Sequence, residues 1–178
     1  MPTPLPIIEN RRRNLSEDLE NRLEALEARI VELESIEGVR AAILQYAHVH
    51  DRGMSDAVAD LFTDDAVLDI TGYGEQFDTS LTGQDAIRAM YNRLDARHNF
   101  NPPFKHMLTN CQITVEGDEA VAITYLDEWG GPQTDKGPGG GLYHDRLRKE
   151  DDGQWRFSHK RIISVSEQTV DEAVKEGI

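Results

Sequence analysis

The sequence predicts an α+β fold in which helices lie on one face of a curved, mostly antiparallel sheet. Over roughly the first hundred residues, apolar side chains recur at helical spacing, interrupted by one short strand-like segment at residues 66–70. After Pro102 and Pro103 the apolar period changes to two, which is typical of strands. Four strand candidates follow, at residues 106–115, 119–129, 141–150 and 154–165.

Residues 1–34 are expected to form an arm and a helical extension. The first 13 residues carry three prolines and three consecutive arginines, a composition typical of an arm rather than a core. An a/d repeat follows, with Glu and Arg on the other helix faces and apolar positions at Leu19, Leu23, Leu26, Ile30 and Leu33. Because the repeat lasts under three heptads, this helix could pack either on its own domain or on a neighbouring subunit.

The middle of the chain is read from helical spacing and from its glycines. The helical pattern continues to about Arg52, and Gly53 can end it. Ser55 can cap a second helix that extends to Phe62, and residues 84–97 show helical spacing again. Residues 130–140 hold five glycines and two prolines, so a loop that borders a site is expected there.

The charge of the chain limits the classes of partner. The 178 residues carry a formal net charge of −14, with 33 Asp and Glu against 19 Lys and Arg. Nucleic acids and anionic membranes both require a basic surface, so neither is expected as a partner. No apolar run approaches about 18 residues, and the N-terminus lacks the apolar stretch of a signal peptide. A cytoplasmic protein that binds a small molecule is therefore expected.

No metal or organic cofactor is expected. Cys111 is the single cysteine, which excludes an intramolecular disulfide and a cysteine-based metal cluster. His48, His50 and Asp51 lie close together in the sequence, but a helix places positions 48 and 50 about 200° apart. Without a pair of ligands one helical turn apart, this group does not predict a metal site.

Strand alternation predicts which polar side chains point inward. In residues 119–129 the bulkier face is expected to point to the core and to include Tyr125, Asp127 and Trp129. In the last strand, His159 and Arg161 share their parity with the apolar residues Trp155, Phe157 and Ile163. In the third strand the inward set is expected to be Tyr143, Asp145 and Leu147.

His106 does not follow the alternation of its own strand. Met107, Cys111, Ile113 and Val115 define one face, and His106 falls on the other unless a β-bulge intervenes. Simpler readings stay open at this point. Asp51 could be an ordinary carboxylate at a helix end, and Arg161 with Asp127 could form a structural ion pair.

Several segments together resemble the SnoaL-like branch of the nuclear transport factor 2-like superfamily. The resemblance rests on residues 36–46 leading to Asp51-Arg52-Gly53, and on residues 61–69, 83–87, 106–110 and 143–159. It implies a domain at residues 35–167, followed by a tail at 168–178. The implied fold is a cone, in which a bent sheet wraps around a pocket and helices lie on its concave face.

Within that superfamily the chain looks most similar to cofactor-free lyases, including scytalone dehydratase, bile acid 7α-dehydratase and hexachlorocyclohexane dehydrochlorinase. The resemblance implies a homo-oligomer, with a trimer favoured and a dimer possible. It also implies that Asp51 and His106 abstract a proton, with Tyr46 as a pocket tyrosine and Arg161 as a last-strand cation. The residues expected to bind substrate are Asp127, Tyr125, Asn110, Trp129 and Tyr143.

The expected function is therefore a dehydratase-like elimination, or a related C–C or C–X cleavage, on a small apolar and hydroxylated substrate. His106 would remove the proton while Asp51 orients the imidazole. Three alternatives on the same fold stay open. They are an isomerase or polyketide cyclase, a hydrolase that activates water with Asp51, Asp127 and Arg161, and a ligand-binding module without catalysis.

Overall fold

The computed structural model describes residues 6–75, 77–98, 105–129 and 140–164. The chain separates into two compact units, Met1–Ser35 and Ile36–Ile178. The helices are α1 (Pro6–His50), α2 (Ser55–Ala59) and α3 (Gln84–His98). The strands are β1 (Phe62–Thr71), β2 (Thr79–Thr82), β3 (Lys105–Glu116), β4 (Glu119–Trp129), β5 (Gly140–Lys149) and β6 (Trp155–Ser164).

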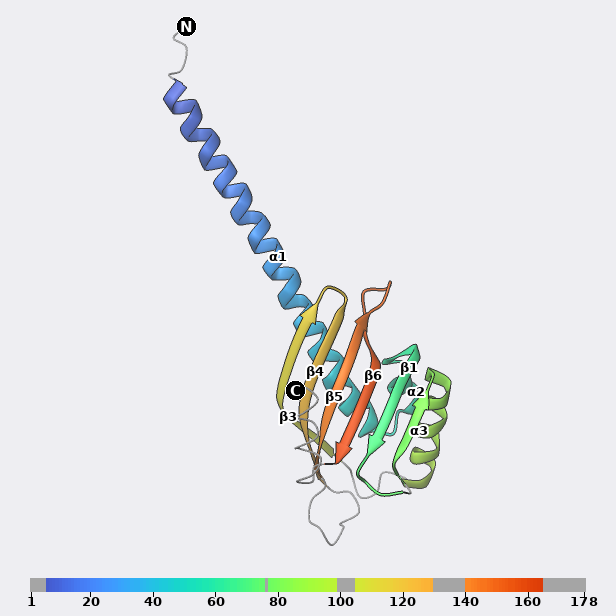
Figure 1. Ribbon diagram of the computed structural model, residues 1–178. Coiled ribbons are helices and arrows are strands. Elements are labelled where there is room, and N and C mark those ends of the chain that lie inside the picture. The colour runs from blue at the N-terminus through green and yellow to red at the C-terminus, as the bar shows by residue number, and fades with distance from the viewer. Residues whose placement is uncertain (1–5, 76, 99–104, 130–139, 165–178) are drawn as a thin grey trace. The chain divides into compact units, whose positions relative to one another are not determined.

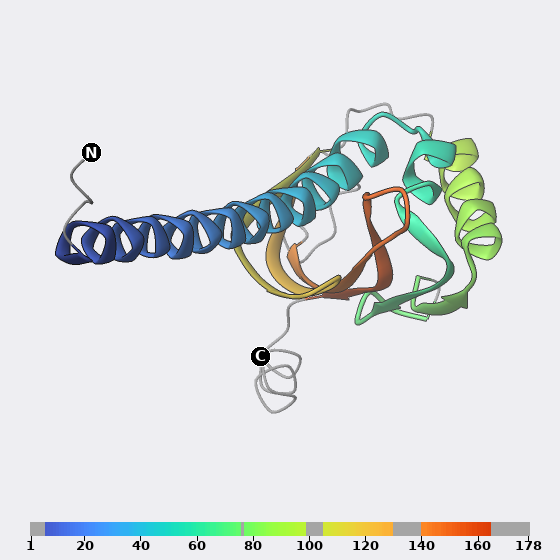
Figure 2. The ribbon, with the colours of Figure 1, turned by 90° about the horizontal axis from the view of Figure 1, so that it is seen from above.

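The strands of the second unit form one curved sheet in the order β2-β1-β6-β5-β4-β3 (Figure 1). The β1–β6 pair is parallel, and the other neighbouring pairs are antiparallel. Figure 2 shows how the sheet bends, with the end of α1 and the short helix α2 on its concave side. This arrangement confirms the predicted α+β fold with helices on one face of a curved sheet.

The core lies between the concave face and the last turns of α1. Val39, Ile43 and Tyr46 recur at helical spacing, and each is at most 1% exposed. They belong to one apolar cluster with Phe62 of β1 and Phe157 of β6. Full burial of a large apolar side chain contributes about 1.5–3 kcal/mol. This packing therefore fixes the end of α1, the segment that leads into Asp51, against the sheet.

Two element boundaries differ from the prediction. Phe62 was expected on the second helix, but α2 ends at Ala59 and Phe62 begins β1. The reason is a pairing with a distant strand, since the backbone N–H of Phe157 donates to the Leu61 carbonyl at 2.8 Å. The short edge strand β2 was not predicted either, because its residues Thr79–Thr82 include a single large apolar side chain, Leu81.

In the first unit the described residues are helical throughout, as the spacing of the a/d repeat predicts. Each apolar residue of that repeat is more than half exposed. The expected arm at residues 1–13 is partly helical as well, because α1 begins at Pro6. Proline suits the first turn of a helix, where its missing N–H would have no partner.

Candidate active site

Asp51 and His106 meet at the end of α1. Asp51 follows the last residue of the helix, and His106 is the second residue of β3. The His106 Nδ1 lies 2.6 Å from an Asp51 carboxylate oxygen, and the backbone N–H of His106 donates to the same carboxylate at 3.1 and 3.2 Å. The His106 side chain is 5% exposed and that of Asp51 is 20% exposed. The structure thus brings together the two residues that the resemblance pairs.

A β-bulge turns His106 toward the interior. The pairing of β3 with β4 shifts between Thr109 and Gln112, and Asn110 adopts a positive φ of 50°. The extra residue places His106 on the face that carries Cys111 and Ile113, whereas Met107 is exposed on the other side. Such a β-bulge is the condition, stated above from the sequence, under which His106 could share a face with Cys111 and Ile113. Asn110 itself is exposed, so its observed part in this region is to shape the backbone.

Aromatic rings continue from the dyad into the core. The His50 ring lies over the His106 ring, with centroids 4.8 Å apart and planes tilted by 32°. His50 also meets Tyr91 edge-on at 5.2 Å and Tyr46 at 5.8 Å. The hydroxyls of Tyr46 and Tyr91 are hydrogen bonded at 2.6 Å. Tyr46, predicted as a pocket tyrosine, therefore lies in the same buried cluster as the dyad, although its hydroxyl already contacts Tyr91.

Burial sets the charge of the groups around His106. It lowers the pKa of His50 to about 3, an effect reinforced by the charge of His106, so His50 is neutral at neutral pH. Burial also raises the pKa of Glu128, which lies opposite His106 in the β3–β4 ladder. The charge of His106 opposes that second shift. His106 is therefore flanked by the neutral His50 ring and by the carboxyl groups of Asp51 and Glu128.

Two tyrosine hydroxyls stand out among the described residues. The oxygens of Tyr73 and Tyr143 are buried and have no hydrogen-bond partner within that part of the chain. Burial raises the pKa of both phenols, so both stay protonated at neutral pH. A buried hydroxyl without a partner costs free energy. Among the described residues, these two O–H groups are therefore unused hydrogen-bond donors.

A buried ion pair lies beneath the tyrosines. Lys160 Nζ lies 3.0 and 3.2 Å from the Asp145 carboxylate, and both side chains are fully buried. The ammonium also sits 3.6 Å from the centroid of the Tyr143 ring and 4.3 Å from that of Tyr46. Burial raises the pKa of Asp145 to about 6 and lowers that of Lys160, and each partner's charge opposes these shifts. The inward set of β5 (Tyr143, Asp145 and Leu147) is confirmed.

Arg161 lies on the opposite face of the sheet, so the prediction that it points to the core is wrong. A second bulge is the reason, since the pairing of β5 with β6 shifts between Arg146 and Leu147 and leaves Ser158 as an extra residue. Phe157 before the bulge and Lys160 after it are both buried in the core. His159 and Arg161 consequently turn outward.

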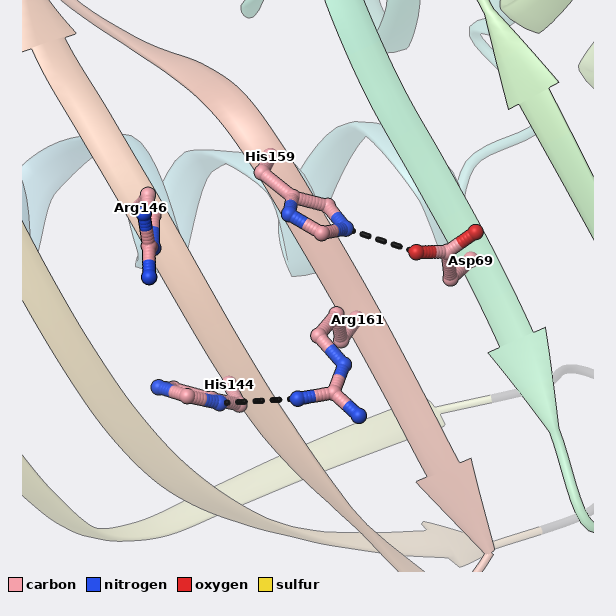
Figure 3. Close-up of a pocket in the computed structure, with 5 residues that line it drawn as sticks. All are labelled: Asp69, His144, Arg146, His159 and Arg161. Atoms are coloured by element: carbon pink, nitrogen blue, oxygen red, sulfur yellow. Dashed lines mark hydrogen bonds and ion pairs between the residues drawn. The ribbon is translucent and has the colours of Figure 1, made fainter. Parts of the chain in front are cut away.

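The outward residues form a basic pocket of about 350 Å³ (Figure 3). Its walls are Asp69 of β1, His144 and Arg146 of β5, and His159 and Arg161 of β6. His159 Nε2 contacts the Asp69 carboxylate at 2.7 Å, and Arg161 donates toward His144 Nδ1 at 3.5 Å. This pocket is separate from the Asp51–His106 pair.

The predicted orientation of β4 is also wrong. Tyr125 is 48% exposed and Asp127 is exposed, whereas Ala122, Thr124 and Leu126 of the other face are buried. The bulk of a face does not decide its direction here, because large rings from α1, β5 and β6 already fill the concave side and leave room for small side chains. Trp129 ends β4, and its side chain lies outside the described residues.

The set of Asp51, Asp127 and Arg161, considered above for water activation, is therefore not assembled. The dyad lies on the inner side of the sheet, whereas Asp127 and Arg161 lie on its outer side. The structure instead places Lys160 and Glu128 on the inner face of the sheet, although strand alternation predicted that both would point outward. A bulge cannot be read from the alternation of apolar residues alone, so no signal in β6 marked Lys160 as buried.

His50 and Tyr91 were not predicted as site residues either. From the sequence, His50 was considered only as a metal ligand, and helical spacing led to the rejection of that role. The same spacing does not predict the contact of His50 with His106. Within residues 6–75, 77–98, 105–129 and 140–164, no cluster of three or more His, Cys, Asp or Glu side chains is placed to hold a metal ion. None of the helices in these ranges is long and apolar enough to cross a membrane.

Comparisons with known proteins agree with this architecture. Residues 31–161 match the SnoaL-like domain family. An NTF2-like protein with a cystatin-like fold from Novosphingobium aromaticivorans superposes with a TM-score of 0.71 at 24% identity, over 85% of this chain and 96% of that one. No curated protein matches the chain in sequence.

Two further solved structures carry names that refer to enzymes. One, described as "Putative Scytalone Dehydratase" and also from Novosphingobium aromaticivorans, has a TM-score of 0.59 at 20% identity, covering 79% of this chain and 89% of that one. A ketosteroid isomerase-like protein from Erwinia carotovora has a TM-score of 0.57 at 20% identity, covering 75% and 98%. At these identities the likeness shows the shared fold.

Proposed function

We propose that this chain, which belongs to the family of SnoaL-like domains, is a cofactor-independent lyase that eliminates water or a related leaving group from a small apolar, hydroxylated substrate. The observation that carries the proposal is the 2.6 Å contact between His106 Nδ1 and Asp51 inside the curved sheet. Structural neighbours named as a dehydratase and as an isomerase-like protein are consistent with proton transfer on this fold.

The contact with Asp51 determines which nitrogen of His106 acts as the base. An ionised carboxylate can only accept hydrogen bonds, so Nδ1 carries the hydrogen and donates a hydrogen bond to Asp51. The lone pair then lies on Nε2, which is the atom that removes a proton from carbon. The imidazolium formed in this step is stabilised by the adjacent carboxylate. Asp51 is itself held by the backbone N–H of His106, so the pair has a fixed geometry.

The elimination balances without a further reactant. His106 takes a proton from carbon, the C–H electrons form a C=C double bond as the C–O bond breaks, and the imidazolium of His106 returns its proton to the leaving hydroxyl, which departs as water. Where the proton lies next to a carbonyl, negative charge develops on the carbonyl oxygen in the transition state. The Tyr143 hydroxyl, which is buried and has no partner among the described residues, is the proposed donor to that oxygen.

Lys160 takes the place that the sequence had suggested for Arg161. Its ammonium lies 3.6 Å from the centre of the Tyr143 ring, so the ring of the proposed donor is in contact with a buried positive charge. In the proposal this charge strengthens the phenol as a hydrogen-bond donor to the carbonyl oxygen on which negative charge develops. The buried aromatic cluster that contains Tyr46, Tyr91 and Tyr143 is consistent with a substrate that is itself flat and apolar.

The dyad is tested with His106→Ala and Asp51→Asn against a panel of hydroxylated aromatic and steroid-like compounds. Loss of water is followed by mass spectrometry, and binding of the same compounds is measured separately by calorimetry. Turnover is expected to fall about 10²–10⁴-fold in each variant, the usual contribution of a general base, while binding is largely retained. Arg161→Gln is the matched control and should keep turnover within about twofold of wild type, because Arg161 lies on the outer face.

Full turnover in both dyad variants would contradict the proposal. If panel compounds bind to the wild type but none is converted, and none exchanges a C–H proton in deuterated water, the chain is a ligand-binding module instead. Proton exchange without loss of water would identify an isomerase, which retains the role of His106 but not the elimination.

Tyr143→Phe separates the proposed donor from a purely structural tyrosine. Removing a buried hydroxyl that has no partner should leave the free energy of unfolding unchanged or raise it by about 1 kcal/mol. Turnover should fall at least about tenfold, since one oxyanion donor is lost. A variant that is destabilised and fully active would show that the hydroxyl supports the fold and does not contact the substrate.

A further inference from the structure

The described residues of the first unit form a helix with an exposed apolar stripe. Its five members recur at alternating steps of four and three residues, and each is more than half exposed: Leu19 (54%), Leu23 (57%), Leu26 (61%), Ile30 (53%) and Leu33 (54%). Scattered apolar residues on a surface are ordinary, but a continuous stripe of Leu and Ile at heptad spacing is not. A stripe of this kind is stable in water when another surface covers it.

The residues beside the stripe show what covers it. With Leu19, Leu26 and Leu33 at the d positions, Leu23 and Ile30 occupy the a positions. The e positions are then all glutamates, namely Glu20, Glu27 and Glu34. The g positions between them, Arg22 and Arg29, are both arginines. In the second and third heptads the stripe is thus flanked by one acidic edge and one basic edge.

This charge pattern favours a second copy of the same helix in parallel orientation. In a parallel pair each g residue faces the e residue of the partner's next heptad. Arg22 would then face Glu27 of the second copy, and Arg29 would face its Glu34. The two-fold symmetry of the pair repeats both contacts. In an antiparallel pair, e faces e and g faces g, which opposes glutamate to glutamate and arginine to arginine. An unrelated partner helix would not be expected to match both edges so regularly.

We infer that residues 19–34 of α1 form a parallel coiled coil with a second copy of this chain. Leucine at all three d positions and Ile30 at an a position favour two strands. Inside one helix, Arg29 approaches Glu32 at 3.8 Å, and both side chains are largely exposed, so this contact leaves the arginine able to reach a partner. The inference is independent of the proposed chemistry, because it uses no residue of the second unit.

Orientation is tested by disulfide formation in full-length chains that carry Cys111→Ser. One chain has Leu19→Cys and the other, tagged to change its mass, has Ile30→Cys. In a parallel pair each position faces itself, and the two positions are about 16 Å apart along the helix, at 1.5 Å per residue. Mild oxidation of the mixture should therefore give 19–19 and 30–30 dimers. A predominant 19–30 product would overturn the inference.

Partner choice is tested by reversing one charged edge at a time, with Leu26→Cys as the crosslinking position in the Cys111→Ser background. R22E/R29E makes both edges acidic, and E27R/E34R makes both basic at the corresponding heptads. At low salt, the yield of crosslinked dimer should be at least about tenfold lower for each variant alone than for the chain with unchanged edges. An equimolar mixture of the two variants should restore the yield, with the mixed dimer as the product. E17R/E24R is the matched control, because it makes the same charge change at b positions away from the stripe.

With both charged edges unchanged, the Leu26→Cys chain is expected to form a crosslinked dimer at micromolar concentration, and the wild-type chain is expected to show a mass above the 20.1 kDa of one chain. Unchanged crosslinking in both edge variants, or loss of crosslinking in the E17R/E24R control alone, would show that the two edges do not pair. A wild-type chain that gives a single-chain mass and no crosslink at any concentration tested would also overturn the inference.

Discussion

The two faces of the sheet differ most clearly along β6, where Lys160 and Arg161 are consecutive residues with opposite surroundings. Lys160 is fully buried, is paired with Asp145 and lies against aromatic rings. Arg161 lines a basic pocket on the outer face with two histidines and a second arginine. A cation on the inner face must be matched by a carboxylate, whereas a cation on the outer face is partly stabilised by water.

The same contrast separates the two histidine–aspartate pairs. His106–Asp51 and His159–Asp69 have similar contact distances of 2.6 and 2.7 Å. The His106 side chain is 5% exposed and that of His159 is 31% exposed. Distance alone therefore does not single out a catalytic pair. The inner pair differs because it adjoins buried rings that exclude water, and in such surroundings electrostatic interactions are stronger.

The largest expected effect is on stability, and it compares neighbouring residues of β6. Lys160→Met leaves the Asp145 carboxylate buried without its cation and should lower the free energy of unfolding by about 3–5 kcal/mol. Arg161→Met, on the outer face, should change it by less than about 1 kcal/mol. Urea denaturation of both variants measures the difference.

A double variant tests the cause of that difference. Lys160→Met combined with Asp145→Leu replaces the pair with apolar side chains and should recover most of the lost stability. If the double variant is no more stable than Lys160→Met alone, packing around the lysine stem rather than the unpaired charge explains the loss. Equal effects of the Lys160 and Arg161 variants would contradict the contrast between the two faces.

The next effect depends on pH and concerns His50. Its pKa is about 3 in the folded chain and near 6.5 when unfolded, so below pH 6.5 the unfolded chain takes up a proton that the folded chain does not. Stability should therefore fall as the pH drops from about 6.5 toward 3, with a loss of about 2 kcal/mol at pH 5 from this residue. Urea denaturation at pH 7 and pH 5 measures it.

The test variant is His50→Gln on the inner face, compared with wild type at both pH values. His50→Gln should remove about 2 kcal/mol of the difference between the two pH values. Asp145, whose pKa is raised to about 6, contributes with the opposite sign, since its stability penalty grows as the pH rises from about 4 to 6. That contribution is present in both wild type and His50→Gln, so it cancels when the two are compared. An unchanged difference in His50→Gln would contradict the assignment.

The sequence predicted those parts of the fold that follow a regular period. The helical period expected up to about Arg52 is observed, with Val39, Ile43 and Tyr46 buried, and strand alternation placed Tyr143 and Asp145 inside. Both predictions succeed because each of these segments keeps its period without interruption. The fold class followed from the change of period near residue 102.

The candidate site was only partly predictable, because the orientation of its side chains depends on interruptions of the strand period. His106 faces inward through a bulge at Asn110, and Arg161 faces outward through a bulge at Ser158. A single extra residue reverses every later side chain, and no apolar pattern announces it. Resemblance to a family supplied His106, because a family motif retains the effect of the bulge. It gave no help with Lys160, which lies next to the arginine that it suggested.

The smallest expected effect concerns the bulge that makes the inner site possible. Asn110 has a φ of 50°, a left-handed conformation that costs most residues about 1–2 kcal/mol and asparagine less. Asn110→Gly should therefore keep the wild-type stability within about 0.5 kcal/mol, whereas Asn110→Ala should lose about 1 kcal/mol. Urea denaturation measures both. Because the Asn110 side chain is exposed, turnover should follow backbone conformation and be retained in the glycine variant. A glycine variant that is as stable as wild type but inactive would instead assign the amide side chain to substrate binding, the role that the sequence first suggested for it.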